Sequence, residues 1–315
     1  MSDSNYILEV KNLCQTFTSG RGNKKITVKA VNDVSFGIHP AETFGLVGES
    51  GCGKTTTGRT IIRLYDPSSG EMTFNGVDIA GPMTKDLRKF LTNNIAMIFQ
   101  DPIESLNPRM TIQEIVGEGL KIRGVTDEKE VHDRVVAMLN KVGLTAEHAT
   151  RYPHEFSGGQ RQRIGIARAI ITEPKLIIAD EPVSALDVSI QAQVINLLND
   201  LKEEMGLTVL FIAHNLSVVK YFCDRIGVMY FGKLVELATS DELFKNPLHP
   251  YTRSLLSAIP LPDPHYEKQR KRITYVPLAE HDYTVDLPSL REVSPGHFVH
   301  CNDAEFKKYQ AMIQE

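Results

Sequence analysis

The chain has few of the features that mark secreted or membrane-spanning proteins. Its 315 residues include only four cysteines and no tryptophan. The cysteines, at positions 14, 52, 223 and 301, have no paired spacing, which indicates a reducing compartment rather than a disulfide framework. No apolar run has the length that a transmembrane helix needs. The N-terminus, Met1–Asn5, lacks the basic start and the apolar stretch of a signal peptide. If the protein serves a membrane, we expect it to do so from the cytoplasmic side, through partners.

A surplus of positive charge is also missing. The formal net charge is -4, which argues against nucleic acid as the principal partner. Hydrophobic residues at 42% and charged residues at 23% are ordinary for a soluble globular protein. The length favours one large domain with an appendage, or two domains.

The most informative stretch is Gly48–Thr56, which fits the pattern G-x-x-x-x-G-K-[ST] between an apolar run and a run with helical character. Its backbone N–H groups and the helix that starts near Lys54 would form a nest for a polyphosphate. Lys54 would reach the β- and γ-phosphates, and Thr55 would coordinate Mg²⁺. A turn that merely links strand to helix is the alternative. The predicted nucleotide-binding residues here are Gly48, Glu49, Ser50, Gly51, Cys52, Gly53, Lys54, Thr55 and Thr56.

Several β-like runs precede this loop and predict an antiparallel sheet beside a nucleotide core. They cover residues 7–10, 26–31, 34–38 and 43–47. Phe17 is placed where its ring could stack on a purine, or it could simply pack in the core or on an edge strand.

Polar side chains end three apolar, strand-like runs further along the chain. Gln100 ends the run 94–100, Asp180 and Glu181 end 175–181, and His214 follows 207–213. Ligands bind at the carboxyl ends of strands in α/β sheets, and unpaired buried carboxylates are costly. We therefore assign Gln100 to Mg²⁺ or to the attacking water, and Asp180 to Mg²⁺ through its water shell. Glu181 is assigned to polarising the attacking water, and His214 to the γ-phosphate. Alternatively, Gln100 caps a turn and His214 is structural.

Residues 103–156 form a mostly helical insertion in this reading. It is followed by Ser157-Gly158-Gly159-Gln160, in which Ser157 is a good N-cap for the next helix. Two glycines also leave a bare helix start that a second phosphate could approach, although ordinary capping is the alternative. Asp187 precedes a further helix, of which it could be the N-cap.

With these residues in hand, the sequence resembles the ATP-binding cassette (ABC) family over about residues 6–240. The resemblance implies an α/β P-loop NTPase cassette with an antiparallel β subdomain, a helical subdomain at about 103–156 and a small C-terminal extension. We expect the nucleotide-binding domain at 1–240 and the extension at 241–315. The motifs, in the family's order, are the phosphate loop, Gln100, Ser157-Gly158-Gly159-Gln160, Asp180-Glu181, Ser184-Ala185-Leu186-Asp187 and His214.

The segments 246–260 and 295–300 look like the tail of cassettes in oligopeptide and dipeptide importers, most like the second ATPase subunit of the Gram-positive Opp/Ami class. Such cassettes dimerise head to tail, so each ATP lies between one chain's phosphate loop and the other chain's Ser157–Gln160. The match to the family's motif at 184–187 also places Asp187 among the nucleotide-binding residues. The resemblance implies ATP and Mg²⁺ as cofactors and a peripheral place on the cytoplasmic face of the membrane. Implied partners are a second, homologous ATPase subunit (a heterodimer), two permeases and an extracellular peptide-binding protein.

Other functions remain open beside oligopeptide uptake. Importers of dipeptides or nickel share this type of tail, and a soluble ABC protein or a P-loop kinase would share the phosphate loop. In the tail itself, Cys301 alone cannot supply the four thiolates of an iron–sulfur cluster, so we expect no metal there. We expect Tyr251, Leu255, Leu256 and Ile259 to form a helical apolar face that docks on the cassette or on the partner subunit.

Overall fold

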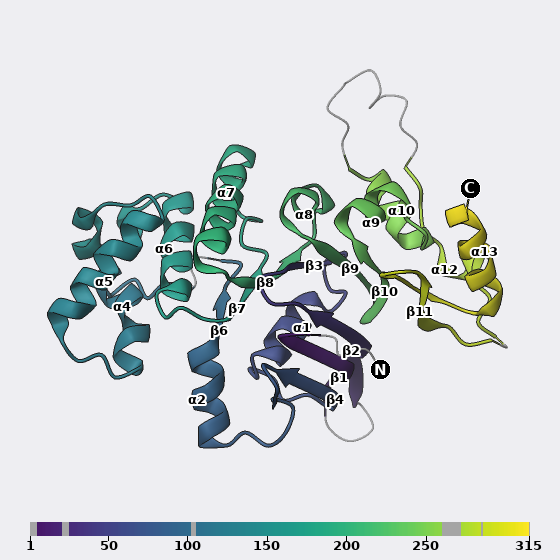
Figure 1. Cartoon of the computed structure of the whole chain (residues 1–315), viewed down its shortest axis with the longest axis horizontal. Helices are drawn as coiled ribbons and strands as arrows, with labels where there is room; N and C mark the ends of the chain where they lie inside the picture. Colours follow the sequence, from purple (N-terminus) through teal and green to yellow (C-terminus); the bar gives the residue numbers. More distant parts are fainter. Residues whose placement is uncertain (1–4, 21–24, 102–104, 260–271, 285, 315) are drawn as a thin grey trace. The chain divides into compact units, whose positions relative to one another are not determined.

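The computed structural model describes residues 5–20, 25–101, 105–259, 272–284 and 286–314. The chain divides into two compact units, and Figure 1 shows the elements of both. The first unit consists of residues 1–80 and 213–315, and the second of residues 81–212. Among the described residues, no helix is long and apolar enough to span a membrane.

The first unit contains an antiparallel sheet, as predicted. Its strands are β1 (Leu8–Ser19), β2 (Ile26–Ile38), β4 (Ser69–Phe74) and β5 (Val77–Asp78), in the order β2-β1-β4-β5. Strand β1 is much longer than the predicted run 7–10.

The break that we expected between residues 31 and 34 is wrong, because β2 runs through it as one strand. Asp33 takes a positive φ of 61°, Asn12 on the facing strand takes 50°, and the Asn12 amide donates to the Asp33 carboxylate at 2.8 Å. The register shifts at this place, so the turn-forming residues make a bulge instead of a turn.

A second sheet in this unit joins the strand before the phosphate loop to the C-terminal residues. Strand β3 (Thr43–Val47) pairs in parallel with β9 (Arg225–Tyr230), and β9 pairs with β10 (Lys233–Thr239). Beyond β10 follow β12 (His297–Cys301) and β11 (Ser289–Ser294), both antiparallel. The helices described in this unit are α1 (Lys54–Ile61), α8 (Leu216–Phe222), α9 (Ser240–Lys245), α10 (Pro250–Ser257), α12 (Pro277–Glu280) and α13 (Asp303–Gln314).

The C-terminal residues have a small core of their own. Helix α13 packs on β11 and β12, as Figure 1 shows at the C-terminus. Burial there raises the pKa of the Cys301 thiol to about 11, which favours the neutral, apolar form. The absence of a metal in the tail stays a prediction. The core consists of Leu248, Val293, Val299, Cys301 and Tyr309, with Phe306 and Ile313 packed against it.

The predicted apolar face of the tail is only partly right. Tyr251 is buried with 2% of its surface exposed, whereas Leu255 and Leu256 are half-buried. Ile259 lies beyond the end of α10, so it is not part of a helical face.

The second unit has a parallel sheet and the helical insertion. Strands β6 (Ile95–Ile98), β7 (Leu176–Asp180) and β8 (Thr208–Ala213) pair in parallel, and every residue of β7 and β8 is buried. Figure 1 shows α4, α5 and α6 gathered together, and α4 packs on both other helices. The helices are α2 (Lys85–Asn94), α4 (Ile112–Ile122), α5 (Glu128–Lys141), the 3-10 turns η2 (Ala146–Thr150) and η3 (Pro153–Glu155), α6 (Gly158–Ile170) and α7 (Val188–Met205).

Candidate functional site

The phosphate loop connects β3 to α1 and lies tightly against the neighbouring backbone. A Cβ atom at Gly48 would lie 2.2 Å from the carbonyl oxygen of Met229, and one at Gly53 would lie 2.2 Å from that of Ala30. Both positions also have positive φ angles, 154° and 109°, so only glycine fits. At Gly51, in contrast, a Cβ would meet no described atom within 4 Å. The loop is therefore fixed at both ends and open to a ligand at Gly51.

Lys54 is buried inside this loop, with 4% of its surface exposed. Its Nζ donates hydrogen bonds to the carbonyl oxygens of Gly48 at 2.8 Å and Glu49 at 3.0 Å. The side chain of Cys52 is buried too, and burial raises the pKa of its thiol, although Lys54 opposes this. A ligand in the loop would therefore meet the backbone of Cys52 and not its thiolate.

Two further predicted residues belong to the first unit. Phe17, near the end of β1, is 38% exposed, and its ring meets that of Tyr65 edge-on with 5.1 Å between ring centroids. His214 is exposed and directly follows β8. An exposed ring and an exposed imidazole are both suited to contact with a ligand.

In the second unit the structure brings Gln100 and Glu181 together. The Gln100 Nε2 lies 3.4 Å from the Glu181 Oε2 and donates to it. Glu181 also has a positive φ of 46°, an unfavourable conformation for a residue with a Cβ, and its N–H donates to the carbonyl oxygen of Ile212 at 2.9 Å. Asp180, the last residue of β7, is fully buried. Glu181 thus combines a strained backbone with a carboxylate held by an amide, next to the buried carboxylate of Asp180. Such backbone strain is typical of functional sites.

The Ser157–Gln160 segment caps helix α6, which agrees with the alternative prediction of ordinary helix capping. The Ser157 Oγ accepts the Gln160 N–H at 3.4 Å, and the Gln160 Oε1 accepts the Ser157 N–H at 3.0 Å, which is a capping box. The two glycines differ. A Cβ at Gly159 would lie 2.7 Å from the Ile190 Cγ2, but one at Gly158 would be in ordinary contact, 3.7 Å from the Leu186 side chain. Of these two glycines, only Gly159 is required by the packing of the chain.

Asp187 occupies the N-cap position of α7, and its exposed carboxylate makes no capping hydrogen bond within the described part of the chain. Capping therefore does not account for this carboxylate. The predicted residues are thus divided between the units. Phe17, the phosphate loop and His214 lie in the first, and Gln100, Asp180, Glu181, Ser157–Gln160 and Asp187 in the second.

One contact at the loop was not predicted. The hydroxyl of Tyr251 accepts a hydrogen bond from the Glu49 N–H, with 3.1 Å between the two heavy atoms. We expected Tyr251 only as part of an apolar face. No local pattern could have shown the contact, because the two residues are 202 positions apart.

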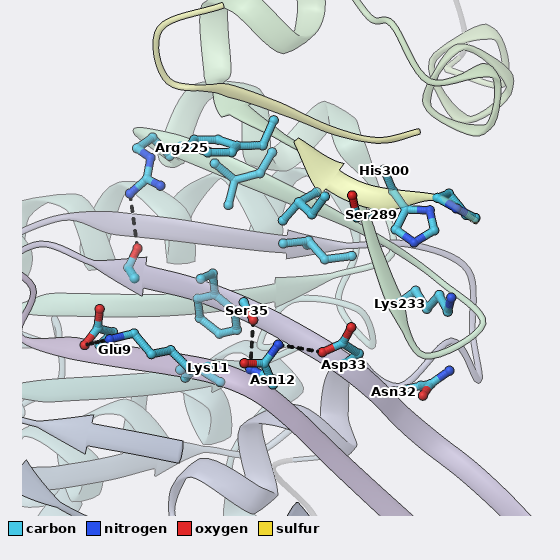
Figure 2. A pocket seen from close by; sticks show the side chains of 18 of the residues that line it. Glu9, Lys11, Asn12, Asn32, Asp33, Ser35, Arg225, Lys233, Ser289 and His300 are labelled. Carbon is cyan, nitrogen blue, oxygen red and sulfur yellow. Dashed lines mark hydrogen bonds and ion pairs between the residues drawn. The ribbon is translucent and has the colours of Figure 1, made fainter. Parts of the chain in front are cut away.

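A cavity of about 450 Å³ lies elsewhere in the first unit, between β1, β2 and the C-terminal strands. Figure 2 shows its polar rim. There the Asn12 side-chain amide donates to the Asp33 carboxylate, and the Asn12 backbone N–H donates to the Ser35 hydroxyl at 2.8 Å. Its described lining residues include none of the predicted site residues. The cavity is therefore distinct from the phosphate loop.

A glycine-rich loop between a buried strand and a helix, with acidic residues at a strand end, defines a P-loop nucleotide-binding protein. Residues 31–184 match the family model described as ABC transporter, and residues 235–284 match that of the oligopeptide/dipeptide transporter, C-terminal region. The chain belongs to the ABC transporter family.

Two curated relatives and one solved structure show how closely the chain follows this family. The chain is 60% identical to the oligopeptide transport ATP-binding protein OppF of Bacillus subtilis, over 96% of this chain and 98% of the relative. It is 53% identical to the dipeptide transport ATP-binding protein DppF of Lactococcus lactis, over 98% of each. The solved ATP-binding cassette MJ0796, bound to ADP and Pi, is 30% identical with a TM-score of 0.67, over 74% of this chain and 98% of that chain.

Proposed function

We propose that the chain is the ATP-hydrolysing subunit of an ABC importer that couples ATP binding and hydrolysis to the uptake of oligopeptides. The observation that carries this proposal is the 60% identity to OppF over nearly the whole length of both proteins. The identity extends through the C-terminal region at 235–284, which cassettes of other types need not have.

The first part of the mechanism is nucleotide binding. The backbone N–H groups around Gly51, where the loop is open, would hold the phosphates, and Lys54 would contact the β- and γ-phosphates. The exposed ring of Phe17 would stack on the adenine. The likeness to a cassette bound to ADP and Pi supports this assignment.

The second part is hydrolysis with Mg²⁺. In this proposal the Thr55 hydroxyl, the Gln100 amide oxygen and the Asp180 carboxylate, the last through its water shell, would supply only oxygen ligands, which suit this cation. Because the Gln100 amide donates through Nε2 to Glu181, its oxygen faces away from that carboxylate and can serve the cation. When bound, Mg²⁺ stabilises charge on the phosphates. Glu181 would orient and polarise the attacking water, and His214 would contact the γ-phosphate.

The third part is a site shared between two cassettes. Ser157–Gln160 and Asp187 would act on the nucleotide of the partner subunit. The space for a Cβ atom at Gly158 supports this, because the fold of the chain itself does not require glycine there. A phosphate that approaches the N-terminus of α6 would require it.

The assembly would consist of this chain, a second homologous ATPase subunit, two permeases and an extracellular peptide-binding protein. The chain would lie on the cytoplasmic face of the membrane, with its helical part (about 103–156) on the permeases. Ile122, at the end of α4, is 73% exposed and offers an apolar contact for them. We keep 1–240 and 241–315 as the proposed nucleotide-binding domain and extension.

Dipeptide uptake is the second candidate, because DppF is 53% identical to the chain. Peptide length would be selected by the other subunits, so this chain alone does not decide between the two.

Purification of the tagged chain from detergent-solubilised membranes tests the proposal. We expect two permeases and a second ATP-binding subunit to co-purify, and Ile122→Asp to lose the permeases but not MgATP binding. Ribosomal proteins in place of permeases would contradict the importer. Uptake by reconstituted vesicles then distinguishes the two candidate functions. A labelled pentapeptide should enter vesicles that hold an oligopeptide importer, whereas a dipeptide importer should take up a labelled dipeptide but not the pentapeptide.

A further inference from the structure

A side chain of the C-terminal region accepts a hydrogen bond from the backbone of the phosphate loop. The Tyr251 hydroxyl accepts the Glu49 N–H at 3.1 Å, and Tyr251 is 2% exposed. Burial raises the pKa of this hydroxyl, so it stays neutral at physiological pH. The bond joins the start of α10 to the first turn of the loop.

The same peptide unit is held on its other side by Lys54. The peptide bond between Gly48 and Glu49 is planar, and it carries the Gly48 carbonyl oxygen and the Glu49 N–H. The N–H donates to Tyr251, and the carbonyl accepts from the Lys54 Nζ at 2.8 Å. Such chains of hydrogen bonds polarise one another. Tyr251 therefore fixes the peptide unit that in turn holds the amine predicted to contact the phosphates.

Tyr251 is itself held by a buried polar network at the start of α10. The Tyr251 N–H donates to the His249 Nδ1 at 3.1 Å. The N–H groups of Leu248 and His249 donate to the Glu236 carboxylate at 2.8 and 3.1 Å, and His297 on β12 lies 2.8 Å from the same carboxylate. Glu236 and His297 are fully buried. The position of the tyrosine is thus set by strands β10 and β12.

The ring of Tyr251 packs separately from its hydroxyl. Its centroid lies 4.4 Å from that of Tyr230, the last residue of β9, and 5.6 Å from that of Tyr275. Removal of the hydroxyl alone would leave these contacts in place. The hydrogen bond to the loop can therefore be tested apart from the packing.

We infer that Tyr251 is a positioning residue of the phosphate loop, through which the C-terminal region strengthens binding of the triphosphate of ATP. This rests on the proposed nucleotide site. Without the hydroxyl, the Gly48–Glu49 peptide can turn, and the Lys54 amine loses a fixed carbonyl partner. Ground-state binding of the phosphates then weakens, while Glu181, in the other unit, keeps its own partners.

The test is Tyr251→Phe in the full chain, with affinities for MgATP and for inorganic tripolyphosphate, which has no base. We expect both affinities to fall by about 3- to 10-fold, the range of one lost hydrogen bond. In the assembled complex we expect KM for ATP to rise by a similar factor while kcat changes less than about twofold. Unchanged affinity for both ligands would overturn the inference, and so would a loss confined to MgATP.

Tyr275→Phe is the matched control, because Tyr275 lies in the same aromatic cluster and, in the part of the chain described, its hydroxyl makes no hydrogen bond to the loop. We expect wild-type affinity; an equal loss in this variant would show that cluster packing is responsible and would overturn the inference. Lys54→Ala, measured in parallel, distinguishes failure of this inference from failure of the proposed nucleotide site. If it weakens binding and Tyr251→Phe does not, only the inference fails; if Lys54→Ala also binds normally, the proposed site fails with it.

Discussion

The side-chain amide of Gln100 donates a hydrogen bond to the carboxylate of Glu181, with 3.4 Å between Nε2 and Oε2. The two residues follow neighbouring parallel strands, β6 and β7, whose carboxyl ends meet at one edge of the sheet. Glu181 is also fixed through its backbone, because its carbonyl oxygen accepts from the Ser184 hydroxyl at 3.0 Å. A carboxylate held in this way can orient a water without first having to be ordered.

The first prediction follows from this carboxylate. Glu181→Gln preserves the shape of the side chain and removes its basicity, so we expect normal MgATP binding and hydrolysis slower by about 10²–10⁴-fold in the assembled complex. The variant should accumulate as an ATP-bound dimer, which size-exclusion chromatography with MgATP detects. Wild-type turnover would move the role to another group, with His214 the next candidate.

The second prediction concerns Lys54. Lys54→Ala removes the cation that we propose contacts the β- and γ-phosphates, and it leaves the glycine-rich backbone in place. We expect MgATP affinity in a titration to fall by about 10- to 100-fold, the range of a charge-assisted hydrogen bond. Thermal unfolding without nucleotide serves as the control for folding. Affinity equal to wild type would rule out the assignment.

The third prediction concerns Gly158, the first residue of α6. Gly158→Asp should leave MgATP binding by the isolated chain intact, because we propose that this position serves the partner's nucleotide. It should block hydrolysis in the assembled complex by placing a carboxylate against that phosphate. An isolated monomer that loses MgATP binding on this change would contradict the shared site.

Gly159→Ala is the matched comparison for fold stability. Its Cβ would lie 2.7 Å from the Ile190 side chain, so we expect a loss of about 1–3 kcal/mol in the free energy of unfolding. Gly158→Ala, with 3.7 Å to its nearest neighbour, should be neutral or stabilising in denaturant unfolding. Equal effects of the two alanines would show that the packing around α6 differs from that described above.

Local patterns predicted much of the fold. The phosphate loop, the buried run of β7 and the N-cap at Ser157 each depend on residues close in sequence, and the structure has all three elements. The continuity of β2 through Asp33 was missed because a bulge depends on the facing strand. The bond between Tyr251 and Glu49 was missed for the same reason, since it joins two distant parts of the chain. Sequence thus predicted elements and candidate residues better than the contacts between them.

The fourth prediction concerns pH. His300, on the rim of the cavity in Figure 2, has its pKa lowered from 6.5 to about 4, mainly by burial and then by Lys233 and His281, against the opposite effects of Glu305 and Asp33. The folded chain thus binds a proton less readily than the unfolded chain, so stability falls as pH drops from about 6.5 towards 4.

We expect this residue to contribute a loss of about 2 kcal/mol in the free energy of unfolding between pH 7 and pH 5. In His300→Gln the decrease in Tm over that interval should be smaller by a few degrees. The measurement is thermal unfolding of both proteins at the two pH values. An identical decrease in wild type and variant would show that His300 is not protonated on unfolding.

We propose that ATP hydrolysis by this chain drives peptide uptake, and one preparation tests this directly. The complex is reconstituted into vesicles with the peptide-binding protein, and ATP hydrolysis and entry of a labelled pentapeptide are measured together, for wild type and Glu181→Gln. We predict that wild type takes up peptide only with MgATP, and that the variant loses both activities while it still binds nucleotide. Peptide uptake by the variant at the wild-type rate, or wild-type hydrolysis with no uptake, would contradict the account.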